Sequence, residues 1–254
     1  MSIRQITPEM RARILTSSDF AAAAGNQALA REYDACIIGS GPGGAVAAAT
    51  LAQAGWKVIL IERGPFFPAE SSSFRVLDMS NRMGHLELTS GLRTALYQGK
   101  GLGGGSLIYG AVAMKPQDFI FDEWSRLSGV ASINGESLEP HYKHIAEVMS
   151  VTKQAITQEN KSNSIVRQMA AALGQSDGLE TVSRYTQGCA GAGLCNLGCG
   201  FNLKGTMANS FIPLGLETGN LTILTECEAH GFEGTRSTTD SIWQTSGRWH
   251  CAHR

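Results

Sequence analysis

Three glycines and one acid stand at the spacing that a nucleotide site requires. Gly39, Gly41 and Gly44 form a G-x-G-x-x-G pattern, and Glu62 follows Gly39 by 23 positions. Gly39 permits a tight turn, Gly41 admits a pyrophosphate close to the backbone, and Gly44 lets a helix pack close to a strand. A carboxylate at Glu62 can accept hydrogen bonds from both hydroxyls of an adenosine ribose, and it repels a 2′-phosphate. The pattern therefore predicts a dinucleotide site and argues against NADP.

The elements that must position these residues are also visible in the sequence. The apolar run 36–38 predicts a buried parallel strand before the glycines, and the run 58–61 predicts a second strand that ends on the acid. Between them, the alanine-rich stretch 45–54 predicts a helix whose first amides and positive dipole end face the phosphates. A lone G-x-G-x-x-G is weak, but strand, glycines, helix and acid within about 30 residues are a strong signal. The alternative is a glycine-rich turn that binds no ligand.

Composition narrows the class of protein. The chain has 254 residues, 43% of them hydrophobic, which suits one large domain or two small ones with a substantial core. A net charge of −1 gives no sign of a nucleic-acid or acidic-membrane partner, and no apolar run is long enough for a membrane span. The first 31 residues lack a signal-peptide pattern, which favours the cytoplasm. Six irregularly spaced cysteines do not suit a disulfide scaffold.

Other segments are assigned by periodicity and by capping residues. We expect a helix over residues 8–24, with Pro8 near its first turn. Residues 64–84 are expected to form an extended surface loop. Residues 86–97 are expected to form either a strand or a short amphipathic segment. Further along we expect a helix over 119–127 capped by Asp118, one from Asn134 or Ser137 to Met149, one over 163–173, and a strand over 221–224.

A second glycine cluster begins at Gly99. Five of the seven residues 99–105 are glycine, which suits a backbone pressed against a flat or charged ligand. A mobile loop is the alternative. The apolar run 107–114 that follows predicts that this segment enters the core.

Three cysteines lie close together near residue 190. Cys189, Cys195 and Cys199 have the spacing C-x5-C-x3-C, which matches none of the usual paired C-x2-C zinc patterns. A metal held by these thiols with Cys227 as fourth ligand is one interpretation. We favour a compact glycine-rich loop without a metal.

Three segments together resemble the glucose–methanol–choline (GMC) oxidoreductases, which are FAD enzymes that oxidise alcohols. Residues 34–64 are shared with many FAD proteins, whereas 99–116 look like the family's own signature. Residues 189–213 resemble the branch with cholesterol-oxidase-like and long-chain-alcohol-oxidising members. The resemblance covers about 32–230 and implies an α/β fold, with an incomplete Rossmann-type FAD-binding domain and part of a substrate or cap domain. The implied organisation is a helical extension over 1–31, the FAD-binding core over 32–120, part of the cap over 121–220, and a returning strand and tail over 221–254.

The resemblance also implies which residues contact FAD. Those expected on its ADP half are Gly39, Ser40, Gly41, Gly43, Gly44, Glu62 and Arg63. Those expected along the pyrophosphate and flavin are Gly99, Gly103, Gly104, Gly105, Ser106 and Tyr109. Many members have Asn where this chain has Tyr109, which still offers a donor and an aromatic face. An NAD-linked dehydrogenase is disfavoured, because such an enzyme has no use for the second glycine segment.

In this family, a base takes the proton of a small-molecule alcohol while a hydride passes to the flavin. The catalytic His and its partner His or Asn lie near the C-terminus of much longer chains, so the resemblance assigns no catalytic residue here. His141 and His144 are expected on a helix face, and His85 and His230 are treated as structural. The electron acceptor, whether oxygen, quinone or another, is left open.

The last residues, 236–254, have neither strand alternation nor a helical stripe. One hypothesis is out-of-frame sequence after a frameshift, which would make the chain an N-terminal fragment. An ordinary surface tail is the alternative, and the encoding DNA in its other frames separates the two. The resulting expectation is an FAD-dependent alcohol oxidoreductase in truncated form, or else a remnant that binds FAD without turnover.

Overall fold

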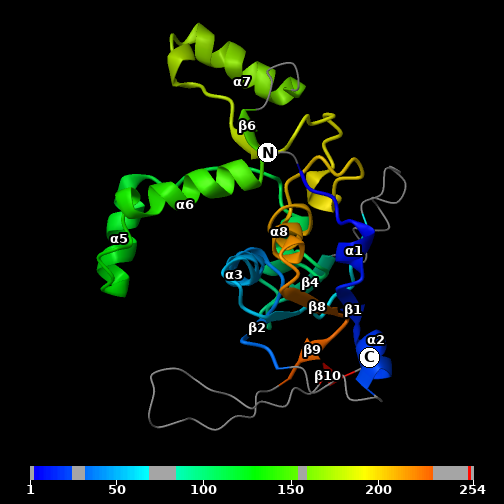
Figure 1. Ribbon diagram of the computed structural model, residues 1–254. Helices are drawn as coiled ribbons and strands as arrows, with labels where there is room; N and C mark the ends of the chain where they lie inside the picture. Colours follow the sequence, from blue (N-terminus) through cyan, green and yellow to red (C-terminus); the bar gives the residue numbers. More distant parts are fainter. Residues whose placement is uncertain (1–2, 25–31, 69–83, 154–158, 231–250, 253–254) are drawn as a thin grey trace.

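The centre of the molecule is a four-stranded parallel sheet. The computed structural model describes residues 3–24, 32–68, 84–153, 159–230 and 251–252 (Figure 1). The strands are β1 (Ile14–Thr16), β2 (Ala35–Ile38), β3 (Val58–Ile61) and β8 (Leu221–Thr225), and their order in the sheet is β1-β8-β3-β2. Helices α3 (Pro42–Gln53) and α8 (Phe211–Glu217) lie together over one face of this sheet (Figure 1).

The unit β2-α3-β3 forms as the sequence predicts. Strands β2 and β3 pair in parallel with Ala35 opposite Val58, and every residue of β3 is buried. The buried residues of α3 all have small side chains, are at most 1% exposed and recur at helical spacing: Ala45, Ala48, Ala49 and Ala52. These methyl groups let the helix axis lie close to the strands.

The N-terminal segment differs from the single helix predicted over 8–24. It forms α1 (Pro8–Arg11), then β1, then α2 (Ser17–Ala24). Ile14 pairs with Ile223 of β8 and is only 2% exposed, so β1 belongs to the main sheet. The helix prediction is wrong at 14–16 because pairing with an open strand edge outweighs local helix preference. The described part of the predicted helical extension over 1–31 thus contributes a strand to the main sheet.

The segment before the second glycine cluster forms a β-hairpin. Strands β4 (Gly84–Leu88) and β5 (Ala95–Gly99) pair antiparallel, which settles the open choice over 86–97 in favour of strands. Most of the extended loop predicted over 64–84 lies outside the described residues. Beyond η2 (Gly104–Leu107), Ala111 is fully buried but Met114 is 75% exposed. The predicted entry of 107–114 into the core is therefore correct to Ala111 and wrong beyond it.

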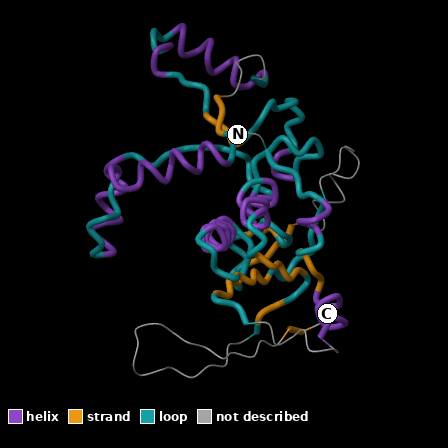
Figure 2. Tube along the Cα trace, viewed as in Figure 1, coloured by secondary structure: helices purple, strands orange, loops and turns teal. Residues whose placement is uncertain are grey.

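Three helices extend away from the sheet (Figures 1 and 2): α5 (Asp118–Ser128), α6 (Gly135–Val148) and α7 (Lys161–Ala172). Asn134 caps α6, because its side chain accepts a hydrogen bond from the Ser137 amide. At α5 the capping position belongs to Gln117, so the prediction that Asp118 is the cap is wrong. Asp118 is the first helical residue, where its charge still favours the helix dipole.

Short elements complete the described chain. Strand β6 (Val151–Lys153) pairs antiparallel with β7 (Ser183–Tyr185), and β9 (Glu228–Ala229) pairs with β10 (Cys251–Ala252). The 3-10 turns are η4 (Ser176–Gly178), η5 (Cys195–Leu197) and η6 (Met207–Asn209). In the described residues, no helix has both the length and the apolar character needed to cross a bilayer.

Candidate cofactor site

The turn between β2 and α3 leaves an open face for a ligand. Gly39 adopts φ +88°, a left-handed conformation that glycine tolerates best. A Cβ added to Gly44 would overlap the carbonyl oxygen of Gly39, so only glycine allows α3 to begin this close to the turn. At Gly41 and Gly43, by contrast, an added Cβ would meet nothing within 4 Å. The space beside these two residues fits a pyrophosphate at the helix N-terminus.

Glu62 lies at the end of β3 and is held by the turn. Its side chain is buried, with 5% of the residue exposed. One carboxylate oxygen accepts from the Ser40 amide at 3.0 Å and from the Ser40 hydroxyl at 2.6 Å, and the other accepts from the Gly64 amide at 2.8 Å. A carboxylate has about four acceptor positions, so one remains for a ligand hydroxyl. The ribose contact of Glu62 stays a prediction. The contact of Arg63 with the cofactor also stays a prediction, and the side chain of Arg63 is exposed.

The structure brings the two glycine segments into contact. A Cβ on Gly104 would lie 2.7 Å from Cα of Gly41, which shows how closely the two backbones approach. The Gly103 amide donates to the Ser40 hydroxyl at 2.9 Å, so Ser40 connects both segments with Glu62. The two predicted groups of residues, one for the ADP half and one for the flavin half, are therefore in contact through Ser40, Gly41, Gly103 and Gly104.

Ser106 and Gly105 lie on the short turn η2 that follows this contact. The Ser106 hydroxyl donates to the Gly103 carbonyl at 2.6 Å and accepts from the Met207 amide at 2.9 Å. A Cβ on Gly105 would meet nothing within 4 Å, so its backbone faces open space. At the start of the segment, a Cβ on Gly99 would overlap the Gly104 carbonyl. The backbone at Gly99 therefore lies directly against the backbone at Gly104.

Tyr109 uses its hydroxyl inside the protein. The hydroxyl donates to the Gly205 carbonyl at 2.6 Å, and burial raises the pKa of this phenol. The donor that the sequence analysis offered to a flavin is thus engaged with backbone. A contact between the flavin and the aromatic face of Tyr109 stays a prediction.

Sequence reasoning did not assign a role to Lys204, which is 2% exposed and lies against the residues that follow the second glycine segment. Its ammonium group donates to the carbonyls of Leu107 at 2.6 Å, Tyr109 at 3.2 Å and Cys195 at 2.7 Å. One signal was available: between Arg184 and Glu217 it is the only Asp, Glu, Lys or Arg in the sequence. Because lysine side chains are mostly exposed, however, this isolation in the sequence does not by itself predict burial.

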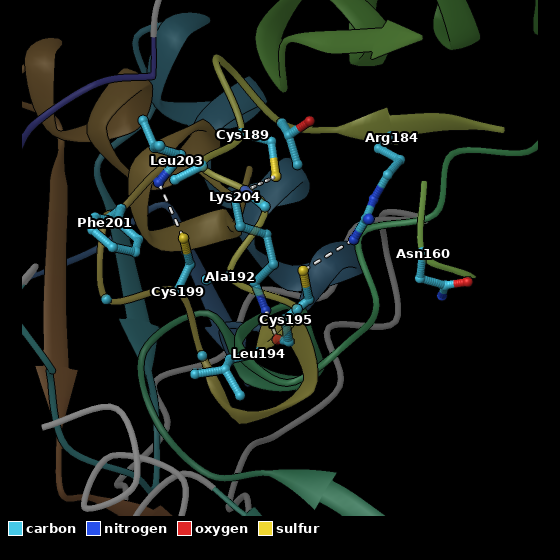
Figure 3. A pocket seen from close by; sticks show the side chains of 16 residues that line it. Asn160, Arg184, Cys189, Ala192, Leu194, Cys195, Cys199, Phe201, Leu203 and Lys204 are labelled. Atoms are coloured by element: carbon cyan, nitrogen blue, oxygen red, sulfur yellow. Dashed lines mark hydrogen bonds between the residues drawn. The ribbon is translucent and has the colours of Figure 1, made fainter. Parts of the chain in front are cut away.

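The cysteine loop lines a cavity of about 220 Å³ beside Lys204 (Figure 3). Arg184 donates to the sulfur of Cys195 at 3.0 Å, and the Leu203 amide donates to that of Cys199 at 3.4 Å. Cys227 packs instead with Ile59 and other residues at the sheet, so it does not serve this loop as a fourth ligand. Within the described ranges, no three His, Cys, Asp or Glu side chains are arranged as metal ligands.

Two of the histidines lie on α6. His141 is exposed, and His144 meets the ring of Phe211 edge-on, with centroids 5.9 Å apart. His230, after β9, is also exposed. The side chain of His85 lies outside what the structure describes. Among the hydrogen bonds of the described residues, none joins a histidine to either glycine segment.

Comparison with curated proteins finds relatives that oxidise alcohols and sterols, as their names state. The chain is 31% identical to long-chain-alcohol oxidase FAO1 of Arabidopsis thaliana over 201 residues, which are 78% of this chain and 26% of that protein. It is 26% identical to cholesterol oxidase of Mycobacterium tuberculosis (strain ATCC 25618 / H37Rv) in an alignment 258 positions long, which covers 86% of this chain and 43% of the relative. The chain thus spans between about a quarter and less than half of these relatives.

Solved structures share the fold. Pyridoxine 4-oxidase from Mesorbium loti superposes with a TM-score of 0.59 at 17% identity, covering 81% of this chain and 45% of that one. A variant of Aspergillus oryzae formate oxidase gives a TM-score of 0.52 at 14% identity. The match covers 78% of this chain and 39% of the formate oxidase chain, which was studied for its FAD modification. The family model described as GMC oxidoreductase matches residues 33–242. The chain therefore belongs to the GMC oxidoreductase family.

Proposed function

We propose that this chain holds FAD as the cofactor-binding part of an oxidoreductase that acts on the CH–OH group of an alcohol. FAD is the cofactor of the family to which the chain belongs. When bound, it supplies the hydride-accepting chemistry, while the protein supplies position and electrostatics. The observation that carries the proposal is the open backbone face at Gly41 and Gly43, next to the fixed carboxylate of Glu62.

The residues of this site would divide the work of holding FAD. The first amides of α3 and the bare backbone of Gly41 would receive the pyrophosphate. Glu62, already oriented by Ser40 and Gly64, would accept from one ribose hydroxyl through its remaining acceptor position. The segment from Gly103 to Ser106 would lie along the flavin half, because its backbone touches the first glycine turn at Gly104.

The names of the relatives support a proposal for the substrate class. Long-chain-alcohol oxidases and a cholesterol oxidase are similar to this chain over more than three quarters of its length. We therefore propose an apolar alcohol, aliphatic or sterol, as the small-molecule substrate. The electron acceptor, whether oxygen, a quinone or another compound, is part of the same test.

A second candidate is that this chain binds FAD without turning over an alcohol. The observation that favours it is the placement of the described histidines on α6 and after β9 rather than beside the glycine segments. Without a positioned base, proton removal from the alcohol loses about 10²–10⁴-fold in rate.

The visible spectrum of the purified chain tests both candidates. We expect bound flavin, which the Gly41→Ala variant should lack, because the added methyl group enters the pyrophosphate space without touching protein. Long-chain, sterol and sugar alcohols are then added anaerobically. Bleaching by an apolar alcohol supports the oxidoreductase, and bound flavin that no alcohol bleaches supports the second candidate. A chain that is folded by circular dichroism but takes up no FAD contradicts both.

A further inference from the structure

Lys204 is a buried cation whose donors match their acceptors one for one. A protonated lysine has three N–H donors. Here the three acceptors are the carbonyls of Leu107, Tyr109 and Cys195. Figure 3 shows the side chain reaching toward Cys195, and its ammonium also lies 5.0 Å from the ring centroid of Tyr109. The hydrogen bonds of this group, within the described residues, all go to backbone carbonyls.

These carbonyls belong to two separate parts of the chain. Leu107 is the last residue of turn η2 and Tyr109 lies two residues beyond it, whereas Cys195 begins turn η5 of the cysteine loop. The backbone of Lys204 is itself fixed by its bridge to Thr186 and by the Asn209 side-chain amide, which donates to the Lys204 carbonyl at 2.9 Å. The lysine therefore joins the flavin-contacting segment to the cysteine loop from a rigid base.

We propose that Lys204 is a positioning residue that holds the segment 103–109 in the conformation that receives FAD, and that it does so only as the ammonium ion. A neutral amine has two donors and one lone pair. The lone pair would face one of the three carbonyls, so loss of the proton breaks at least one contact and releases part of the segment. This inference rests on the proposed binding of FAD and adds a residue that controls it.

The burial of Lys204 and the charges around it set the pH at which it loses its proton, and this pH is accessible to experiment. Burial lowers the pKa of Lys204 from 10.5 to about 8. The neighbouring Cys195 and Cys199 side chains oppose this shift in the pKa of Lys204, and the Arg184 cation on β7 adds to it. Tyr109 offers its ring and its carbonyl, and its hydroxyl is bonded to Gly205. The protonated fraction of Lys204 therefore falls between about pH 7 and 9.

FAD affinity across this pH range tests the proposal. Titration of the chain with FAD, followed by flavin fluorescence, should show binding that weakens above pH 8. Lys204→Met removes all three donors and should bind about tenfold more weakly at pH 6.5, with no dependence up to pH 9. Lys204→Gln retains two donors and should match the wild-type affinity at high pH. The matched control is Lys153→Met, because Lys153 is an exposed lysine on β6.

A second measurement needs no cofactor. Pulse labelling with iodoacetamide at pH 7, read by peptide mass spectrometry, reports how freely the cysteine loop opens. Cys195 should label about tenfold faster in Lys204→Met and Lys204→Gln than in the wild type, with Cys36 on β2 as internal reference. If FAD does not bind at any pH but Cys195 labels faster in the variants than in the wild type, the proposed function is wrong. The proposal that Lys204 holds the segment 103–109 against the cysteine loop is then still supported. Equal labelling, or the same pH dependence of FAD binding in folded Lys204→Gln and wild type, overturns the proposal.

Discussion

The hydroxyl of Ser40 donates a 2.6 Å hydrogen bond to the carboxylate of Glu62. The same hydroxyl accepts from the Gly103 amide, so one buried oxygen connects the first glycine turn, the acid of β3 and the second glycine segment. Ser40 thereby couples the residues expected on the ADP half of FAD to those expected on the flavin half.

Replacement of Ser40 by alanine should weaken this connection. Glu62 loses one donor and the Gly103 amide loses its acceptor, both in the protein interior. We expect the free energy of unfolding to fall by about 2 kcal/mol, measured by urea denaturation. Ser164→Ala on α7 is the control, because that hydroxyl is exposed and bonds only within its own helix. A Ser40→Ala protein as stable as this control would show that the connection is not important.

Alanine at Gly44 and alanine at Gly41 should have opposite effects. At Gly44 the methyl group overlaps the Gly39 carbonyl, so α3 must move, and we expect a loss of about 3 kcal/mol or more in unfolding free energy. At Gly41 the methyl group meets no protein atom, and stability should stay near wild type while FAD binding is lost. Thermal unfolding and FAD titration of both variants separate the two roles. Normal FAD binding by Gly41→Ala would place the pyrophosphate elsewhere.

The Tyr109→Phe variant should be less stable than the wild type but should bind the cofactor in the same way. The variant removes the donor to the buried Gly205 carbonyl, which predicts a loss of about 1–3 kcal/mol. The aromatic face remains, so the visible spectrum of bound FAD should not change. Tyr109→Leu removes the ring as well and serves as the comparison. A spectrum altered in Tyr109→Phe would mean that the hydroxyl reaches the flavin.

Stability should depend on pH through Lys204. Its pKa is about 8 in the folded chain and 10.5 as its ordinary value, so between these pH values the unfolded state binds the extra proton. Stability therefore rises with pH across this window, by up to about 3 kcal/mol, and this contribution is flat below pH 8.

Cys36 affects the pH dependence of stability in the opposite direction. Burial raises its pKa from 9.0 to about 11, so stability falls as the pH rises between those values. The difference in unfolding free energy between wild type and Lys204→Met isolates the lysine at each pH, because both proteins retain Cys36. If the difference in unfolding free energy between the two proteins does not vary from pH 7 to 10, the lowered pKa of Lys204 is contradicted.

Local patterns explain why much of the site could be predicted. The strands β2 and β3, the helix α3 and the acid Glu62 lie within one short stretch, where spacing alone specifies the arrangement. Strand β1 could not be predicted in this way, because Ile14 becomes a strand residue only by pairing with Ile223. The contacts of Lys204 were equally out of reach, since its three acceptors come from two distant segments and are backbone atoms that no residue type reveals.

The sheet order also determines when this chain can fold. Strand β3 pairs with β2 shortly before it in the chain, but its other neighbour, β8, begins only at Leu221. On the ribosome, the βαβ unit therefore emerges with one edge of β3 unpaired until residues 221–225 have been made. An apolar strand edge exposed for that long is open to pairing with other nascent chains. Folding of this protein in the cell should consequently depend on chaperones that bind before residue 225 appears.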